Sequence, residues 1–204
     1  MAQDSVFINC PFDAEFDGLR NAMVFAVYDC GFRPRCALES ANAHEYRFEK
    51  IKKMIKESRF GIHDISRTEL DATNNLPRFN MPLELGLFIG AMSYGSRSVK
   101  DKSLLILDRE QYRYQKYISD ISGQDIRAHL NCERTLIKCV RDWLHSECKG
   151  TVRLPGGTYI ADRYEQFKAR LPALCAKVRC QVHELTFVDY SNLASEWAAS
   201  HPLN

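Results

Sequence analysis

The stretch "VFINCPFDAEFDGLRNAMVFAVYDCGF", residues 6–32, decides the fold of this chain. Its first residues, 6–10, form a short apolar run closed by Pro11, which predicts a buried β-strand. Residues 13–30 then carry apolar side chains at helical spacing, and Gly31 stands where a helix commonly ends. The stretch therefore predicts a strand that is followed at once by a helix.

The same alternation continues as far as residue 108. Residues 32–38 predict a second strand, although Pro34 weakens it, and residues 44–58 predict a second helix. The chain then shows the patterns of a third strand over 60–65, a polar loop over 66–79, a helix ending near residue 94 and a fourth strand over 102–108. Because strands that alternate with helices form a parallel sheet, we expect an α/β, flavodoxin-like fold with helices on both faces of the sheet.

The pattern changes beyond residue 115. Pro172 predicts a kink or a break in the second of three further helices, which are expected over residues 132–148, 159–178 and 189–200. We therefore expect an α/β domain over residues 5–115 and a helical extension over residues 116–204 that packs on it.

The composition is that of a globular protein, with 45% hydrophobic and 26% charged residues. The formal net charge of +2 is too balanced to indicate nucleic acid as a partner. The N-terminus lacks the pattern of a signal peptide, and no apolar run reaches the ~20 residues that span a bilayer, so we expect a cytoplasmic protein without a membrane contact. The eight cysteines include no Cys-x-x-Cys and no Cys/His pairing, so we expect reduced thiols and no metal site.

Parallel sheets of this kind bind ligands at the carboxyl ends of their strands, near the point where the strand order reverses. That edge would carry the residues that end or follow the predicted strands: Asn9, Cys10, Pro11, Asp64, Ile65, Ser66 and Asp108. His63 precedes Asp64, but successive side chains of a strand point to opposite faces, so we expect a structural role for His63.

The stretch "RFNMPLELGLFIGA", residues 78–91, places Glu84 inside an apolar run. One interpretation is structural: if Met81 is the N-cap, Pro82 lies in the first turn and Glu84 at the third helical position, where a carboxylate suits the helix dipole. The other interpretation is catalytic, because Met81 is a poor N-cap and the helix is apolar nearly all round, which predicts a buried helix. A carboxylate at a dry rim with a second acid, Asp64, nearby has a shifted pKa that suits a nucleophile or a general base.

Three segments, "FINCPFD" (7–13), "HDIS" (63–66) and "MPLELGLFIGA" (81–91), resemble the nucleoside 2-deoxyribosyltransferase-like family and its distant TIR-type relatives. The resemblance covers residues 5–108, roughly half of the chain. It implies that Asp64 and Glu84 correspond to the family's strand-end aspartate and helix-start glutamate. It also implies that the Cys10-Pro11-Phe12 segment corresponds to the family's loop after the first strand.

The chain departs from the family just before Glu84. The family often carries Asp-x-Gly-Thr there, whereas this chain has Asp71-Ala72-Thr73 followed by residues 74–81. For this reason we favour hydrolysis of a nucleotide such as NAD, the reaction of the TIR-type relatives, over deoxyribosyl transfer.

The resemblance implies an enzyme that cleaves an N-glycosidic bond. Cleavage develops oxocarbenium character on the sugar, which Glu84 would stabilise or attack, while Asp64 would hold a hydroxyl or help to protonate the leaving base. Arg67 and Arg78 flank the loop before Glu84 and suit a phosphate or a carboxylate, and Phe12 suits stacking on a base. The predicted substrate-binding residues are Asn9, Cys10, Pro11, Phe12, Ser66, Arg67, Arg78, Asn80 and Met81.

We therefore predict a glutamate-dependent glycosidase that takes NAD or another nucleotide or nucleoside as its substrate and needs no cofactor. By resemblance only, the chain would serve bacterial antiviral defence and build its site as a homo-oligomer. The alternative is a catalytically inactive, nucleotide-binding sensor or assembly module.

Overall fold

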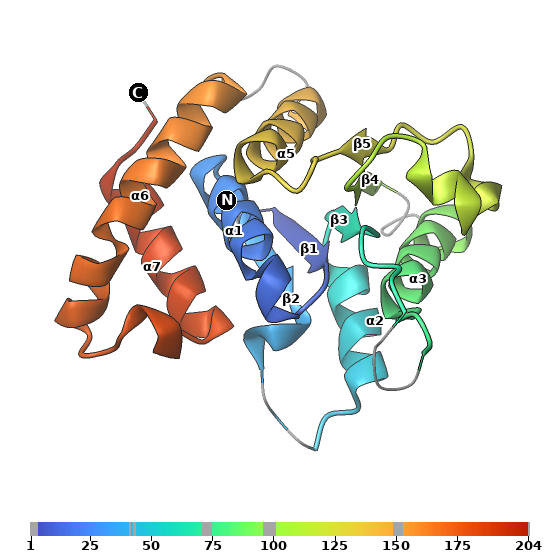
Figure 1. Cartoon of the computed structure of the whole chain (residues 1–204), viewed down its shortest axis with the longest axis horizontal. Coiled ribbons are helices and arrows are strands. Elements are labelled where there is room, and N and C mark those ends of the chain that lie inside the picture. The colour runs from blue at the N-terminus through green and yellow to red at the C-terminus, as the bar shows by residue number, and fades with distance from the viewer. Residues whose placement is uncertain are drawn as a thin grey trace.

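The computed structural model describes residues 4–40, 42, 44–70, 75–95, 101–148 and 153–203. Within them, five strands form one all-parallel sheet in the order β2-β1-β3-β4-β5 (Figure 1). The strands are β1 (Ser5–Asn9), β2 (Arg33–Cys36), β3 (Phe60–Asp64), β4 (Ser103–Asp108) and β5 (Arg127–Ala128). This arrangement confirms the predicted α/β fold with a flavodoxin-like parallel sheet.

Helices cover both faces of the sheet, as expected. They are α1 (Asp17–Asp29), α2 (Arg47–Glu57), α3 (Asn80–Tyr94), α5 (Glu133–Glu147), α6 (Gly157–Lys177) and α7 (Phe187–Ser200). α1 and α5 pack on one face, and α2 and α3 pack on the other. α6 and α7 form a further layer against α1 (Figure 1).

Alternation along the strands explains why both faces of the sheet are apolar. In β1, Ile8 points to the core beneath α1 and α5, while Phe7 points to the core beneath α2 and α3. In β3, Ile62 joins the first core, and His63 contacts the rings of Phe7 and Phe88 on the second face. Strands covered on both faces need such side chains, because burial stabilises the fold by about 25 cal/mol for each Å² of apolar surface.

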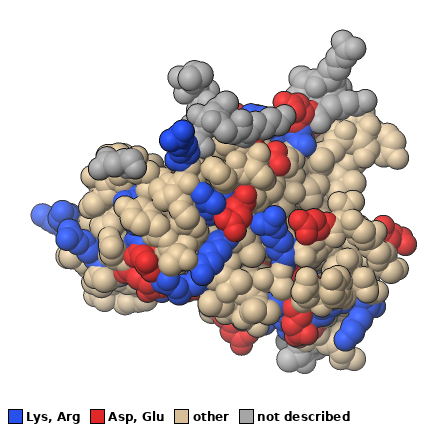
Figure 2. Space-filling view, turned by 90° about the horizontal axis from the view of Figure 1, so that it is seen from above, with Lys and Arg blue, Asp and Glu red and all other residues tan. Residues whose placement is uncertain are grey.

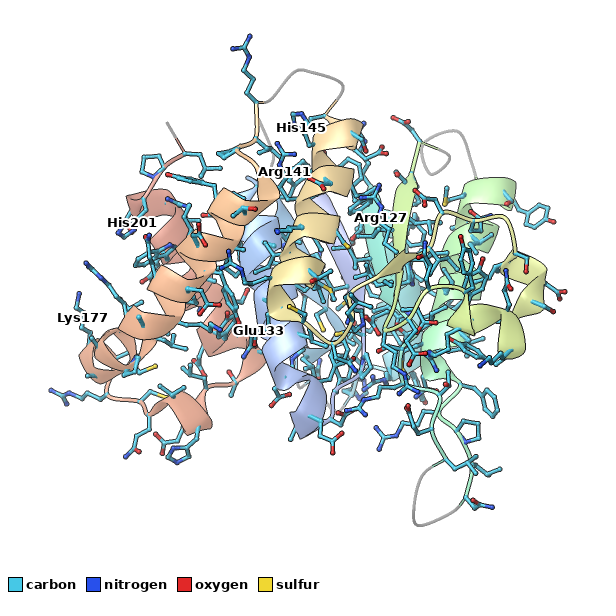
Figure 3. All side chains as sticks on the ribbon, turned by 45° about the horizontal axis from the view of Figure 1, so that its top comes forward. Arg127, Glu133, Arg141, His145, Lys177 and His201 are labelled. Carbon is cyan, nitrogen blue, oxygen red and sulfur yellow. The ribbon has the colours of Figure 1, made fainter. Side chains whose placement is uncertain are left out.

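The sheet extends past residue 115, where the sequence suggested the end of the α/β domain, because β5 pairs with β4. α5, α6 and α7 share one buried core with α1, to which Phe25, Phe167 and Trp197 contribute. At the start of α5, Glu133 faces α1 (Figure 3). It accepts a hydrogen bond from Lys168 of α6 at 2.6 Å. The helical extension therefore packs on the core as expected, and the two parts share one hydrophobic interior.

Two helices differ from their predicted course. α6 runs through Pro172, so the helix does not break there. α1 begins at Asp17 rather than at Asp13, because residues 14–16 form a 3-10 turn. The Asp13 side chain caps that turn by accepting a hydrogen bond from the Phe16 N–H at 3.1 Å.

No helix in the described ranges is long and apolar enough to cross a membrane. Cys10, Cys30, Cys36 and Cys175 are buried thiols. On the face drawn in Figure 2, basic and acidic side chains are interleaved rather than gathered into a basic patch.

A buried ion pair joins the helical extension to the first helix of the sheet. Nη2 of Arg163, in α6, lies 2.7 Å from Oδ1 of Asp29, at the end of α1, and both side chains are buried. Burial raises the pKa of Asp29, although its hydrogen bonds to Arg163 oppose that shift. Removal of either partner would leave the other as an uncompensated buried charge, which would destabilise the fold.

The substitution Arg163→Ala should lower the free energy of unfolding by about 3–5 kcal/mol, because it leaves the Asp29 carboxylate buried without its partner. Urea denaturation followed by circular dichroism measures this loss. The control is Arg134→Ala, which removes an exposed ion pair with Asp162 and should lower the free energy of unfolding far less. Equal losses in the free energy of unfolding for the two variants would show that burial does not make the Arg163–Asp29 pair more important for stability than an exposed pair.

Candidate active site

A cavity of about 350 Å³ opens at the carboxyl edge of the sheet, between the ends of β1 and β3. The chain leaves β1 toward β2 on one side and leaves β3 toward β4 on the other, so the strand order reverses at this point. The lining residues follow β1, begin α2, follow β3 and begin α3: Asn9, Cys10, Pro11, Phe12, Asp13, Arg47, Arg67, Arg78, Asn80, Met81 and Glu84. The cavity therefore lies where this class of fold binds its ligands.

Nine of the predicted site residues line this one cavity. They are Asn9, Cys10, Pro11, Phe12, Arg67, Arg78, Asn80, Met81 and Glu84. The floor is formed by buried residues such as Asn9, Pro11 and Glu84, while Arg78 and Asn80 are exposed at the rim. Burial raises the pKa of the Cys10 thiol well above its ordinary value, so this floor residue stays protonated and is no nucleophile.

The structure does not bring Asp64 to this cavity, contrary to the expectation that Asp64 and Glu84 share a rim. Asp64 is fully buried, and its Oδ1 accepts hydrogen bonds from the backbone N–H and the hydroxyl of Ser66 at 2.9 and 2.5 Å. Its Oδ2 lies 3.2 Å from Nε2 of His129, a residue beyond β5. Strand alternation turns Asp64 away from α3, and Ser66 lines a neighbouring cavity instead.

Glu84 is the buried carboxylate of the cavity. Only 7% of the residue is exposed, and burial raises its pKa to about 7, although the positive charge of Arg47 lowers it somewhat. Among the described residues, no group donates a hydrogen bond to this carboxylate. A buried acid without a donor costs free energy, and such costs concentrate at functional sites.

The helix-cap interpretation of Glu84 is wrong. α3 begins at Asn80, with Phe79 at the N-cap position and no side-chain cap. Met81 therefore lies inside the helix, and Glu84 is its fifth residue, outside the capping-box position. The helix is also not buried all round, because Leu83 is 54% exposed. Capping thus gives no reason for a carboxylate at position 84.

The Asn9 side chain joins the end of β1 to the start of α3. Its Nδ2 donates to the backbone oxygen of Met81 at 2.9 Å and lies 3.0 Å from Nδ1 of His63. Because Met81 and Glu84 are one helical turn apart, this hydrogen bond helps to fix the position of Glu84 in the floor of the cavity. His63 itself is fully buried and lies outside the cavity lining, which agrees with its expected structural role.

Arginine side chains give the cavity a cationic rim. Arg47, the first residue of α2, has its guanidinium carbon 5.5 Å from the centre of the Phe12 ring. Nη2 of Arg67 lies 3.0 Å from Oδ1 of Asp13 and 2.6 Å from Oε2 of Glu15. Such exposed pairs contribute only ~0–1 kcal/mol each, so a ligand phosphate can take the place of these carboxylates.

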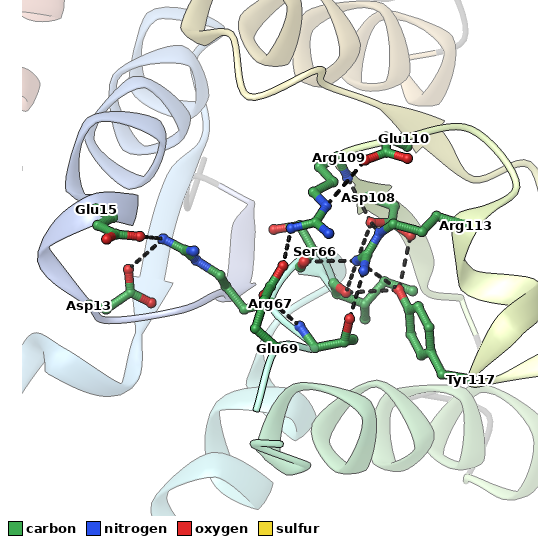
Figure 4. A network of polar contacts seen from close by, with 12 residues as sticks. Asp13, Glu15, Ser66, Arg67, Glu69, Asp108, Arg109, Glu110, Arg113 and Tyr117 are labelled. Atoms are coloured by element: carbon green, nitrogen blue, oxygen red, sulfur yellow. Dashed lines mark hydrogen bonds and ion pairs between the residues drawn. The ribbon is translucent and has the colours of Figure 1, made fainter. Parts of the chain in front are cut away.

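A second cavity of about 340 Å³ lies beside the first and shares Arg67 with it. Its other lining residues are Glu15, Phe16, Gly18, Leu19, Ser66, Arg109, Asn131 and Glu133. In Figure 4, Arg67 reaches from the loop after β3 toward Asp13, of the first cavity, and Glu15, of the second. The Arg67 side chain therefore belongs to the wall between the two cavities.

Three residues of this edge were not among the predicted site residues: Arg47, Asp13 and His129. A usable signal existed for the first two, because helix starts follow the carboxyl ends of the strands and lie at the same edge. No signal existed for His129, which lies beyond the segments that carry the family resemblance. Asp71-Ala72-Thr73, the departure from the family motif, lies outside the described residues.

Comparisons with protein-family models, with curated protein sequences and with solved structures gave no match to this chain. In the described ranges, no group of three or more His, Cys, Asp or Glu side chains could hold a metal ion.

The raised pKa of Glu84 makes stability depend on pH. Between the ordinary value of 4.5 and the folded value of about 7, the folded chain holds a proton that the unfolded chain releases. Stability should therefore fall as the pH rises through this window. Glu84→Gln removes this pH dependence, so the free energy of unfolding of the variant should rise by about 3 kcal/mol relative to that of the wild type between pH 4 and pH 8.

Urea denaturation of both proteins across this pH range measures the difference. Glu49→Gln, which changes an exposed residue of α2, is the control and should follow the wild type at every pH. A difference between Glu84→Gln and the wild type that stays constant with pH would contradict the shifted pKa.

Proposed function

We propose that this chain is a glutamate-dependent enzyme that cleaves the N-glycosidic bond of a nucleotide or nucleoside, with hydrolysis of an NAD-type nucleotide as the favoured reaction. The observation that carries the proposal is the buried Glu84 carboxylate, without a hydrogen-bond donor among the described residues, in the floor of the cavity at the strand-order reversal. The short segments that resemble the nucleoside 2-deoxyribosyltransferase-like and TIR-type families support the same reaction.

The chemistry uses Glu84 as an anion. When the glycosidic bond breaks, positive charge develops on the sugar, and a carboxylate in a dry cavity stabilises that charge or attacks the anomeric carbon. The base leaves with the bonding electron pair, and water or a second base then takes the sugar. A pKa of about 7 gives a substantial fraction of the carboxylate form at neutral pH.

The cavity suits a nucleotide in size and charge. Its volume of about 350 Å³ falls within the ~300–1,000 Å³ that ligand pockets usually span. The rim arginines Arg47 and Arg67 would meet a phosphate, and Phe12 offers a ring next to Arg47. In this proposal the sugar lies at the Glu84 floor and the phosphate at the rim.

Protonation of the leaving base needs a different group from the one that the sequence suggested. Asp64 does not line the cavity, and the second carboxylate there is Asp13, which accepts a hydrogen bond from Arg67 at 3.0 Å. A carboxylate can accept several hydrogen bonds, so Asp13 is suited to accept one from a sugar hydroxyl as well as the one from Arg67. A nicotinamide leaving group carries a positive charge in NAD and leaves as a neutral molecule, so it needs no proton, which favours NAD over a nucleoside.

The second candidate function is a nucleotide-binding sensor or assembly module without catalysis. The position of Asp64 outside the cavity favours this sensor function, because Asp64 and Glu84 do not face each other as a catalytic pair of acids would. A homo-oligomer, a cytoplasmic location and a role in antiviral defence stay predictions from the sequence.

Incubation of the wild type with NAD, and separately with deoxyadenosine, should release nicotinamide or adenine. Glu84→Gln should lower this release by about 100-fold or more, because it removes the charge that stabilises the transition state. Chromatography of the free base measures the rate, and Glu49→Gln is the control that should leave it unchanged. Absence of release, with NAD still bound in calorimetry, would favour the sensor.

The reaction should speed up as the pH rises. If Glu84 acts as a carboxylate, kcat/KM increases through an apparent pKa of about 7, the value that burial gives this group. Initial rates of base release between pH 5 and pH 9 measure the profile. A rate that falls over this range would instead assign Glu84 the part of a general acid.

A further inference from the structure

We infer that Asn9 presents its side-chain oxygen to the cavity as a fixed hydrogen-bond acceptor, that this oxygen takes a donor of the ligand such as a sugar hydroxyl, and that His63 is the positioning residue that holds it there. The kind of ligand rests on the proposed function. The orientation of the amide rests on the contacts of Asn9 alone.

The backbone fixes which way the Asn9 amide points. The carbonyl of Met81 can only accept a hydrogen bond, so the Asn9 atom that faces it at 2.9 Å is the donor, Nδ2. The same nitrogen lies 3.0 Å from Nδ1 of His63. The two hydrogens of Nδ2 are thus directed to two acceptors on two different elements, β3 and α3.

His63 is held in the form that accepts. Because Nδ1 faces a donor, the neutral ring carries its proton on Nε2. Burial lowers the pKa of His63 to about 3, so the ring stays neutral at physiological pH. The rings of Phe7 and Phe88 contact the imidazole edge to face, which restricts its rotation.

The remaining polar atom of Asn9 is its oxygen, Oδ1. Asn9 is 2% exposed and lines the floor of the cavity, and no described residue donates a hydrogen bond to this oxygen. The floor therefore offers two strong acceptors, the Asn9 oxygen and the ionised Glu84. Such a floor selects a hydroxyl or amide N–H and rejects a phosphate, which the arginine rim takes instead.

Histidine NMR of the full chain tests the positioning without any ligand. With uniform ¹⁵N labelling, His63 should show the neutral, Nε2-protonated tautomer at every pH from 5 to 8. Asn9→Leu, which keeps a similar shape without the amide, should shift the Nδ1 signal because the donor is gone. A proton on Nδ1, or titration of His63 between pH 5 and pH 8, would overturn the assignment.

Calorimetry tests the acceptor, in a Glu84→Gln background that prevents turnover. Adenosine should bind about 3–10-fold more tightly than 2′-deoxyadenosine or 3′-deoxyadenosine, and Asn9→Leu should bring that preference to within about twofold. An unchanged preference in Asn9→Leu, or no nucleoside binding at all, would overturn the inference. The base-release assay does not use Asn9→Leu, so failure of the proposed function is detected separately from failure of this inference.

Two variants of His63 separate positioning from packing. His63→Asn keeps an acceptor near the place of Nδ1, whereas His63→Leu removes it, and both lose the ring. Adenosine should bind about 3–10-fold more weakly to His63→Leu and to within about twofold of the parent for His63→Asn. Equal weakening in the two variants would show that His63 acts only through packing and would overturn its role as a positioning residue.

Discussion

The amide nitrogen of Asn9 donates to Met81 at the start of α3 and faces His63 in the neighbouring strand, and the geometry of the candidate site depends on this contact. α3 has no side-chain cap, so its first turn is located by tertiary contacts rather than by its own sequence. Met81, Glu84, Leu85 and Phe88 form the buried stripe of the helix at the spacing of one and two turns. Packing of that stripe against β1 and β3 places Glu84 in the floor of the cavity. The carboxylate is therefore positioned by apolar packing and one amide, rather than by partners of its own.

This arrangement costs stability that a different side chain at position 84 would not cost. Leucine or methionine would complete the apolar stripe, whereas Glu84 is buried with only a distant attraction to Arg47. Local patterns of the chain otherwise agree with the fold, and the exceptions in such proteins are expected at functional sites. The same burial that destabilises the anion moves its pKa toward neutrality. The cost and the chemical use of Glu84 thus have one physical cause.

Periodicity in the sequence was sufficient to predict the fold and one side of the candidate cavity. Residues 6–32 predicted strand and helix correctly, and the rule for parallel sheets led to Asn9 through Phe12. Strand alternation also predicted that His63 and Asp64 point to opposite faces of the sheet, but it does not tell which of the two faces carries the cavity. Which face carries the cavity depends on where α3 docks, and that is a tertiary property. β5 was missed because its two residues, Arg127 and Ala128, are too few to show a period, and their place is set by pairing with β4.

The carboxyl edge of the sheet has one closed part and one open part, and the contrast between them argues for the site more strongly than any single residue. At the end of β4, Oδ1 of Asp108 accepts hydrogen bonds from Arg113 and Oδ2 accepts one from Tyr117 (Figure 4). Arg113 also donates to the backbone oxygens after β3, so this network satisfies its own polar groups and closes the edge. Between β1 and β3, by contrast, Glu84 and the oxygen of Asn9 face a cavity without a donor among the described residues. A ligand that donates hydrogen bonds to both groups would complete the hydrogen bonding of this open part of the edge.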